Sequence, residues 1–330
     1  MQFRVKARLE VRITAADVGK RVSVRSLTGA GDGATTFTDT LGILSSWTDG
    51  VLSVTRRTGE TVRLAESALV AGKVVPAAPA RRRGVPAASV AELAAVAARS
   101  WPAPEAERLG GWLLRAGAGW SRRANSAVRL GPGGPERERV VAWYAARGLP
   151  ARFQLTTGAE GADERLVAAL DALGWAADGF TATRVGALAP LADREPDGRV
   201  VVGRELTEGW LAANRSALRD PATARRVLTG GPLVLFGEVP AGAGEPPAAV
   251  GRCVVDGRWA GFSSIEVDRA HRRRGLATAL MAELARAALA EGASAAWLQV
   301  TRENAAAGAL YDRLGFAEHH HYHYRTAPAG

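Results

Sequence analysis

Residues 261–316 read GFSSIEVDRAHRRRGLATALMAELARAALAEGASAAWLQVTRENAAAGALYDRLGF, and this stretch decides the fold. It begins with an apolar strand, residues 261–267, which runs into an arginine-rich turn. A helix follows, because Leu276, Leu280 and Leu284 recur at intervals of four residues and share one face. A second apolar strand is predicted at residues 294–300. The order strand, turn, helix, strand indicates a mixed α/β (α+β) fold.

The turn between the first strand and the helix has the composition of an anion-binding site. A helix N-terminus carries backbone N–H groups without acceptors and a partial positive charge. Gly275 and Ala277 are small enough for a phosphate to approach the backbone, and Arg272 adds charge. The spacing Arg272-x-x-Gly275-x-Ala277 resembles the Gln/Arg-x-x-Gly-x-Gly/Ala signature of the GCN5-related N-acetyltransferases (the GNAT superfamily), which wraps the pyrophosphate of coenzyme A.

A second motif lies downstream in the order expected for that superfamily. Asn304 opens a predicted helix over residues 304–314, and Tyr311 follows about two turns later on the same side. With Gly315 and Phe316 these residues resemble the GNAT pattern Asn-x-x-Ala-x-x-Leu-Tyr-x-x-x-Gly-Phe. The resemblance covers about residues 196–330. It implies a mixed, mostly antiparallel sheet flanked by helices, N-acetyltransferase activity, and acetyl-CoA as cosubstrate.

The resemblance also implies which residues hold acetyl-CoA. The backbone from Ile265 to Val267 would hold the acetyl carbonyl and the pantetheine arm, and the turn from Arg272 to Thr278 would hold the pyrophosphate. The full set is Ile265, Glu266, Val267, Arg272, Arg273, Arg274, Gly275, Leu276, Ala277, Thr278 and Asn304. Tyr311 would protonate the departing thiolate, a task that a phenol can perform. The alternative for Tyr311 is an aromatic side chain packed in the core.

The chain departs from the superfamily at the general base. Some relatives place a glutamate on the strand before the turn, where this chain has Gly261. Glu266 or a chain of water molecules is then the candidate acceptor of the amine proton. Arg273 also stands where glycine is common, and Ala277 where glycine is commonest. No cysteine is placed for a covalent acetyl intermediate, so direct attack of the amine in a ternary complex is expected.

The segment that precedes this domain echoes it. Residues 173–175 (Leu-Gly-Trp) correspond to residues 314–316 (Leu-Gly-Phe), and residues 153–155 correspond to residues 298–300. Leu170 then falls where Tyr311 lies in the later copy, and no counterpart of the arginine–glycine turn precedes it. We therefore predict a degenerate GNAT-like domain at residues 88–192 and a catalytic domain at residues 193–330. The first copy would pack against the second and wall the substrate cleft.

Residues 1–75 differ in character from the rest of the chain. Short alternating strands with turns at Asp49-Gly50 and residues 58–60 predict a small SH3-like β-barrel. Residues 76–87 form an alanine- and proline-rich linker that contains three arginines at 81–83. The order of barrel, linker, degenerate copy and active copy resembles an actinobacterial family of tandem GNAT proteins. Its members are described as histone-acetyltransferase-like or as N-acetylglutamate synthases.

The resemblance to the actinobacterial tandem GNAT family does not determine which amine accepts the acetyl group. The α-amine of L-glutamate is our first candidate, with Arg122 or Arg123 available to bind its carboxylates. Lysine side chains of a protein, or other small amines, are the alternatives. A non-catalytic acyl-CoA sensor belongs to another class, and Tyr311 with its motif argues against it.

The composition of the chain argues against several other classes of protein. The 330 residues carry a formal net charge of +10, and the first 84 residues hold 14 basic and 7 acidic residues. This excess is a weak signal for nucleic acid, because arginine is frequent along the whole chain. No apolar run approaches the ~18 residues of a membrane span, and the start lacks an apolar signal segment, so a cytoplasmic protein without membrane partners is expected. The single cysteine, Cys253, excludes a disulfide framework.

A histidine-rich segment lies near the C-terminus. His319, His321 and His323 alternate along the last predicted strand and would share one face, where three imidazoles can bind zinc. No carboxylate spacing supports such a site, so no metal is expected, and a solvated strand is the preferred interpretation.

Overall fold

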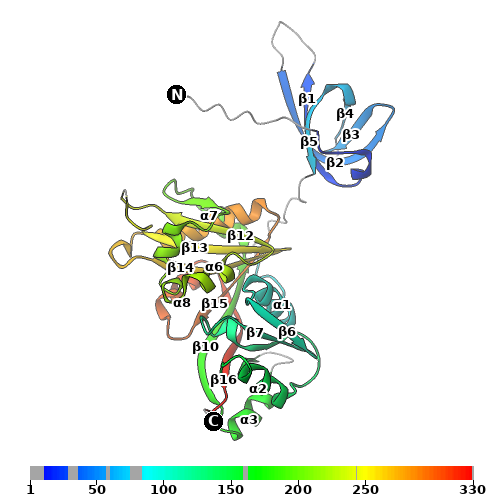
Figure 1. Cartoon of the computed structure of the whole chain (residues 1–330). Helices are drawn as coiled ribbons and strands as arrows, with labels where there is room; N and C mark the ends of the chain where they lie inside the picture. The colour runs from blue at the N-terminus through cyan, green and yellow to red at the C-terminus, as the bar shows by residue number, and fades with distance from the viewer. Residues whose placement is uncertain are drawn as a thin grey trace. The chain divides into compact units, whose positions relative to one another are not determined.

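The chain forms two compact units, Met1–Ala78 and Pro79–Gly330, and each is described by itself (Figure 1). The computed structural model describes residues 11–28, 36–56, 60–74, 84–158, 163–242 and 244–328. The arginines at 81–83 and most of the predicted linker lie outside the described residues.

The smaller unit is an antiparallel sheet. It contains β1 (Arg21–Thr28), β2 (Thr36–Thr48), β3 (Val51–Thr55), β4 (Thr61–Ala65) and β5 (Leu69–Val74), in the order β4-β3-β2-β1-β5. Asp49 and Gly50 both have positive φ, as the predicted tight turn between β2 and β3 requires. A closed, SH3-like barrel was predicted and is not found, because in the described part of this unit no pairing joins β4 to β5.

The larger unit is built on one long mixed sheet. The strands are β6 (Glu105–Leu109), β7 (Trp112–Ala116), β8 (Ala127–Arg129), β9 (Arg152–Thr157), β10 (Ala176–Ala187), β11 (Val201–Gly203), β12 (Leu233–Val239), β13 (Ala249–Asp256), β14 (Trp259–Val267), β15 (Ala295–Thr301) and β16 (Ala317–Thr326). Their order is β11-β12-β13-β14-β15-β10-β16-β9-β8-β7-β6. The mixed α+β architecture with helices flanking the sheet confirms the predicted fold class.

We call residues 88–192 of this unit the earlier half and residues 193–330 the later half. Long strands join the two halves. β10 belongs to the earlier half in sequence, yet it lies between β15 and β16 and pairs antiparallel with both. β16, the last strand of the chain, pairs with β9 of the earlier half. β10 and β16 therefore run side by side through the middle of the unit (Figure 1). The predicted boundary between residues 192 and 193 lies at the end of α4 (Leu188–Ala192), and one continuous sheet contains strands from both sides of it.

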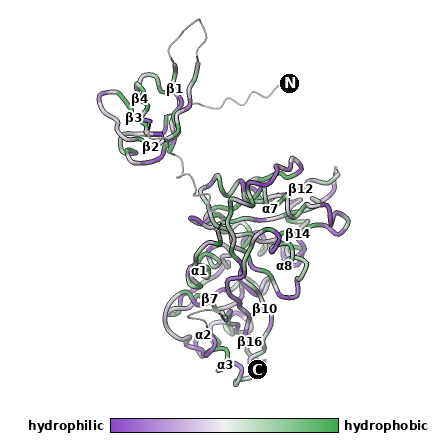
Figure 2. The backbone as a smooth tube through the Cα atoms, turned by 180° about the vertical axis from the view of Figure 1, so that it is seen from behind, coloured by the Kyte–Doolittle hydropathy of each residue, from purple (hydrophilic) through white to green (hydrophobic). Residues whose placement is uncertain are grey.

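Helices pack against the sheet in both halves of the unit. They are α1 (Val90–Ser100), α2 (Arg137–Ala145), α3 (Glu164–Ala172), α4 (Leu188–Ala192), α5 (Glu208–Ala213), α6 (Pro221–Leu228), α7 (Leu276–Ala290) and α8 (Ala305–Arg313). One core lies between the sheet and α4, α7 and α8, and α7 is apolar over most of its length (Figure 2). Two further cores pack α1, α5 and α6 against the sheet, and a fourth packs α2 and α3 on the earlier half.

Most predicted elements of the later half are found within a few residues of their expected ends. The sequence also predicts a helix over residues 207–217, but α5 ends at Ala213. The Asn214 side chain accepts hydrogen bonds from Ser216 Oγ at 2.6 Å and from the backbone N–H of Ala217 at 3.0 Å, and such local bonds compete with helix continuation. In the described part of the chain, no helix has the length and apolar character needed to cross a bilayer.

Candidate active site

The parallel pairing of β14 and β15 ends in the middle of the sheet. It runs from Trp259 opposite Ala295 to Phe262 opposite Leu298 and goes no further. Beyond that point β14 is irregular, because Ser264 has φ of +52° and the register with β13 shifts between Val250 and Arg252. The two strands therefore leave backbone groups available to a ligand just past Phe262.

Gly261 lies on the paired part of β14, and its lack of a side chain has a packing reason. A Cβ atom built there would lie 2.6 Å from the indole ring of Trp297 on β15. The position where some relatives place a glutamate is therefore filled by an aromatic ring.

The arginine-rich turn has the backbone of an anion site. After a short 3-10 turn at Arg269–His271, both Arg273 and Gly275 adopt left-handed φ values of +65° and +75°. The first helical bond of α7 runs from the N–H of Ala279 to the carbonyl of Gly275. Among the described residues no acceptor is found for the N–H groups of residues 274–278. These groups form a nest of donors at a helix N-terminus, which suits a pyrophosphate.

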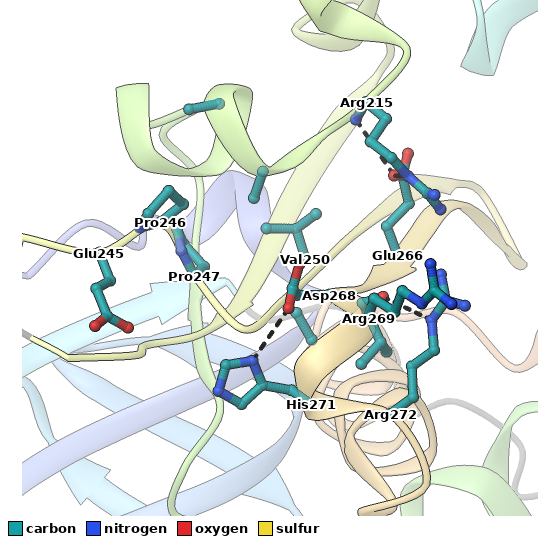
Figure 3. Close-up of a pocket in the computed structure, with 14 residues that line it drawn as sticks. Arg215, Glu245, Pro246, Pro247, Val250, Glu266, Asp268, Arg269, His271 and Arg272 are labelled. Carbon is teal, nitrogen blue, oxygen red and sulfur yellow. Dashed lines mark hydrogen bonds and ion pairs between the residues drawn. The ribbon is translucent and has the colours of Figure 1, made fainter.

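A cavity of about 720 Å³ lies beside this turn (Figure 3). Three of the predicted coenzyme-binding residues, Glu266, Val267 and Arg272, line it. The Glu266 carboxylate forms an ion pair with Arg215, whose Nε lies 3.1 Å away. His271 Nδ1 lies 3.5 Å from the Asp268 carboxylate on the same wall.

A second cavity, of about 500 Å³, opens where β14 and β15 separate. Phe262, Ser263 and Ser264 of β14 line one part, and Gln299 and Thr301 of β15 another. Four arginines also line it, namely Arg122, Arg123, Arg152 and Arg219, and we call it the arginine-lined cavity. Residues 119–123 reach it from the earlier half, so both halves build its wall.

Comparison with known proteins assigns this arrangement to a family. The family described as "Probable histone acetyltransferase Rv0428c C-terminal" matches residues 87–325. The chain belongs to this family. It is 30% identical over 324 residues to the probable histone acetyltransferase Rv0428c of Mycobacterium tuberculosis, with 94% of this chain and 95% of that protein covered. It is 29% identical over 244 residues to a Bacillus subtilis protein described as uncharacterized N-acetyltransferase YobR, with 70% and 95% covered.

A solved structure agrees at the level of the fold. The GCN5-related N-acetyltransferase from Kribbella flavida aligns with a TM-score of 0.54 and 19% identity, over 74% of this chain and 98% of that one. The chain is thus a GNAT-superfamily N-acetyltransferase, as its two motifs predicted.

The acetyltransferase carries its remaining predicted coenzyme residues around the turn and on α8. The Leu276 side chain is buried in the core and Ile265 packs against it, so both would offer only backbone groups. Arg273 and Arg274 are exposed, and Gly275, Ala277 and Thr278 lie at the start of α7. Asn304 caps α8, because its side chain accepts a hydrogen bond from the N–H of Ala307 at 3.2 Å.

Tyr311 lies on α8 in the core between that helix and the sheet. Its ring meets Phe316 edge to face at 6.0 Å. Burial raises the pKa of its phenol to about 12, with the Arg184 guanidinium opposing the rise. Tyr311 and Asn304 line neither of the two cavities described above. Tyr311 therefore packs in the core, as the alternative interpretation expected, and its phenol also stays protonated at neutral pH.

Sequence reasoning missed most of the arginine-lined cavity. It singled out Arg122 and Arg123 but not Arg152 or Arg219, which come from β9 and from the segment before α6. No local spacing links these positions, since only the tertiary fold brings them together.

The histidine-rich segment forms β16 and serves structural contacts. His319 Nε2 lies 2.9 Å from the Ala88 carbonyl, His321 Nε2 lies 2.6 Å from the Glu318 carboxylate, and His323 stacks on Phe180. Across the described ranges no three His, Cys, Asp or Glu side chains gather as metal ligands.

Proposed function

We propose that the chain transfers an acetyl group from acetyl-CoA directly to a primary amine held in the same complex. The observation that carries this proposal is the run of N–H groups at residues 274–278, which have no acceptor in the described part of the chain and which span the left-handed Gly275 and the start of α7. A pyrophosphate supplies the acceptors that such a run requires. Open space around Gly275 leaves room for it.

Bound acetyl-CoA would supply an activated thioester. The backbone of Ile265 to Val267, past the end of the β14–β15 pairing, would orient the carbonyl, and residues 272–278 would hold the pyrophosphate. The neutral amine attacks the carbonyl carbon, and the carbon–nitrogen bond forms as the carbon–sulfur bond breaks. The departing thiolate takes a proton from the Tyr311 hydroxyl, and the proton that the nitrogen loses passes through water to restore the phenol. A phenol whose pKa is raised to about 12 remains protonated and able to donate.

Two features support direct transfer over a covalent acetyl-enzyme. Cys253 is fully buried in β13, and burial raises the pKa of its thiol to about 12, so it is a poor nucleophile. The α7 helix and α8 pack in one core of the sheet, whereas the arginine-lined cavity is lined by Trp101 and Trp120, which pack in another core with α5 and α6. Coenzyme and acceptor would then meet at the separated strands from opposite sides.

L-Glutamate is the acceptor we propose first, and a protein lysine is the alternative. The arginine-lined cavity supports the former. The description of the Mycobacterium tuberculosis relative as a probable histone acetyltransferase supports the latter. A coenzyme sensor without turnover is the candidate from another class.

The test follows free-thiol release from acetyl-CoA by the full chain, with L-glutamate, a lysine peptide and no amine as three arms. Amine-dependent release together with mass-spectrometric detection of the acetylated amine is the expected result. Tight acetyl-CoA binding with no transfer to any amine would favour the sensor instead.

A further inference from the structure

We propose that the arginine-lined cavity is the acceptor site and that it selects a small amine that also carries a carboxylate, with Arg123 as the residue that binds this carboxylate. The proposal rests on the proposed acetyl transfer, and it goes further by choosing among acceptor classes. A basic lysine-containing peptide is the class that it disfavours.

The lining of this cavity is cationic without compensating carboxylates. Four arginines line it, and neither Asp nor Glu is among its described lining residues. Within the described ranges, Arg122 is the one of the four that has an ion pair, with Asp178 at 2.8 Å. Arg152 donates from Nε to the Thr326 hydroxyl at 3.0 Å, which leaves its charge unneutralised. A cavity of one sign concentrates ligands of the opposite sign.

Arg123 is the arginine best prepared for a ligand. Its guanidinium lies over the Trp101 ring at 5.0 Å, and Trp101 is itself stacked on Trp120 at 5.6 Å with an interplanar angle of 7°. The hydroxyl groups of Tyr322 and Tyr324, which also line the cavity, interact with the same guanidinium. Nε of Arg123 is buried and has no hydrogen-bond partner among the described residues. A carboxylate bound to the guanidinium edge would fill that unmet donor.

Arg252, which does not line the cavity itself, adds positive charge next to its lining residues. Arg252 is fully buried on β13 and donates only to neutral groups, including the carbonyls of Leu228 at 2.6 Å and Gly230 at 2.5 Å. Its guanidinium lies 5.4 Å from the Trp101 ring centroid, and Nη1 is 3.4 Å from Ser263 Oγ, a residue of the cavity. Burial lowers the pKa of Arg252 to about 9, which still leaves it charged at neutral pH.

Size and position fit a small acceptor. A volume of about 500 Å³ suits an amino acid rather than a folded protein segment. Ser263 and Ser264, where the strands separate and the acetyl group would arrive, line the same cavity as Arg123. An acceptor whose amine faces the strands can therefore place its carboxylate on Arg123. Since Arg123 comes from the earlier half, that half would supply specificity although it lacks the coenzyme motif.

The test compares matched acceptors on the full chain. L-Glutamate, L-glutamine and L-glutamine amide differ stepwise in carboxylates, and a basic lysine peptide is the fourth arm. We expect kcat/KM to fall along the first three, and Arg123→Gln to lower it about 10- to 100-fold for glutamate while leaving L-glutamine amide nearly unchanged. Arg165→Gln, an exposed arginine on α3, is the control with the same charge change. Arg123→Lys keeps the charge and should recover part of the activity.

Several outcomes would overturn the proposal. Equal losses for all acceptors in Arg123→Gln would mean that Arg123 has a merely structural role, and a preference for the basic peptide would exclude carboxylate selection. If the wild type acetylates none of the four, the proposed function fails, and calorimetry of L-glutamate binding still decides the cavity. Binding that Arg123→Gln weakens and Arg165→Gln does not supports carboxylate recognition, and absence of binding contradicts it.

Discussion

Arg184 on β10 donates a hydrogen bond from Nη1 to the Asp312 carboxylate on α8 at 2.5 Å. The same nitrogen lies 3.4 Å from the Gly308 carbonyl, so the guanidinium contacts two successive turns of this helix. Its side chain is only 13% exposed. A strand from the earlier half thus contacts the helix that carries Tyr311, the proposed proton donor, and this contact holds that helix in place.

We predict that Arg184→Gln loosens α8. The free energy of unfolding should fall by about 1 kcal/mol, because Asp312 is largely exposed and its pairing is partly screened by solvent. The rate of acetyl transfer should fall as well, since Tyr311 adjoins Asp312. Urea unfolding and steady-state kinetics measure the two effects. Arg313→Gln, exposed on the same helix, is the control, and equal effects of the two substitutions would contradict the anchoring role.

Tyr311→Phe removes the proposed proton donor and keeps the ring in its core. We expect kcat to fall about 100-fold, within the range that general acids contribute, while the KM for acetyl-CoA changes little. Tyr144→Phe is the matched control, because that phenol is buried against the Arg115 backbone in the earlier half. A Tyr311→Phe enzyme with normal kcat would assign Tyr311 to packing alone.

The raised pKa of Tyr311 makes a second prediction, on pH. Because burial raises this pKa to about 12, the phenol stays in its donating form as the pH rises through the range where the acceptor amine loses its proton. The rate should therefore increase from about pH 6 to about pH 10 and reach a plateau without a falling limb. A falling limb near pH 9 that disappears in Tyr311→Phe would be incompatible with this pKa.

The sequence motifs could be identified because each depends on residues close together in the chain, and the structure gives the local reason for each. Gly275 is recognisable because a left-handed residue before α7 favours glycine, and the leucines of α7 reveal their buried face through spacing. Asn304 was selected as a coenzyme ligand, but its side chain caps α8, which is reason enough for an asparagine at that position.

The features that could not be predicted from the sequence depend on contacts between segments that lie far apart in the chain. The sequence of β10 predicts a strand but does not predict which strands pair with it. β10 lies between β15 and β16 because this strand of the earlier half is inserted among strands of the later half. The arginine-lined cavity joins Arg123 and Arg152 of the earlier half to Arg219 of the later half. In the smaller unit, β5 was not predicted, and the expected barrel closure depends on pairing that alternation alone does not specify.

Gly275→Ala tests the turn. The residue has φ of +75° with open space around it, so an added methyl group meets no atom but strains the backbone by about 1 kcal/mol. We expect the KM for acetyl-CoA to rise about 10-fold, since strain in the turn displaces the N–H groups that would hold the pyrophosphate. Gly148→Ala is the control, because Gly148 has φ of +63° and equal space between α2 and β9. A similar KM in both variants would separate the turn from coenzyme binding.

Glu92 connects α1 to the start of β14, and its ionisation makes that contact dependent on pH. One carboxylate oxygen accepts hydrogen bonds from Trp259 Nε1 and Arg258 Nη2, both at 2.8 Å. Burial by itself would raise the pKa of Glu92, but the Trp259 and Arg258 bonds outweigh it and hold the pKa below its ordinary value of 4.5. The contact is therefore fully stabilising above that ordinary value and is lost as the pH falls through the lowered one.

Glu92→Gln should thus lower the free energy of unfolding by about 1 kcal/mol at neutral pH, and the difference from wild type should shrink as the pH falls below the ordinary pKa of 4.5. Urea unfolding at a series of pH values measures both. Glu205→Gln, at an exposed glutamate without a partner in the described residues, should leave the neutral-pH value unchanged. If the Glu92→Gln difference instead stayed constant down to about pH 3, the carboxylate charge would have no part in holding α1 against β14.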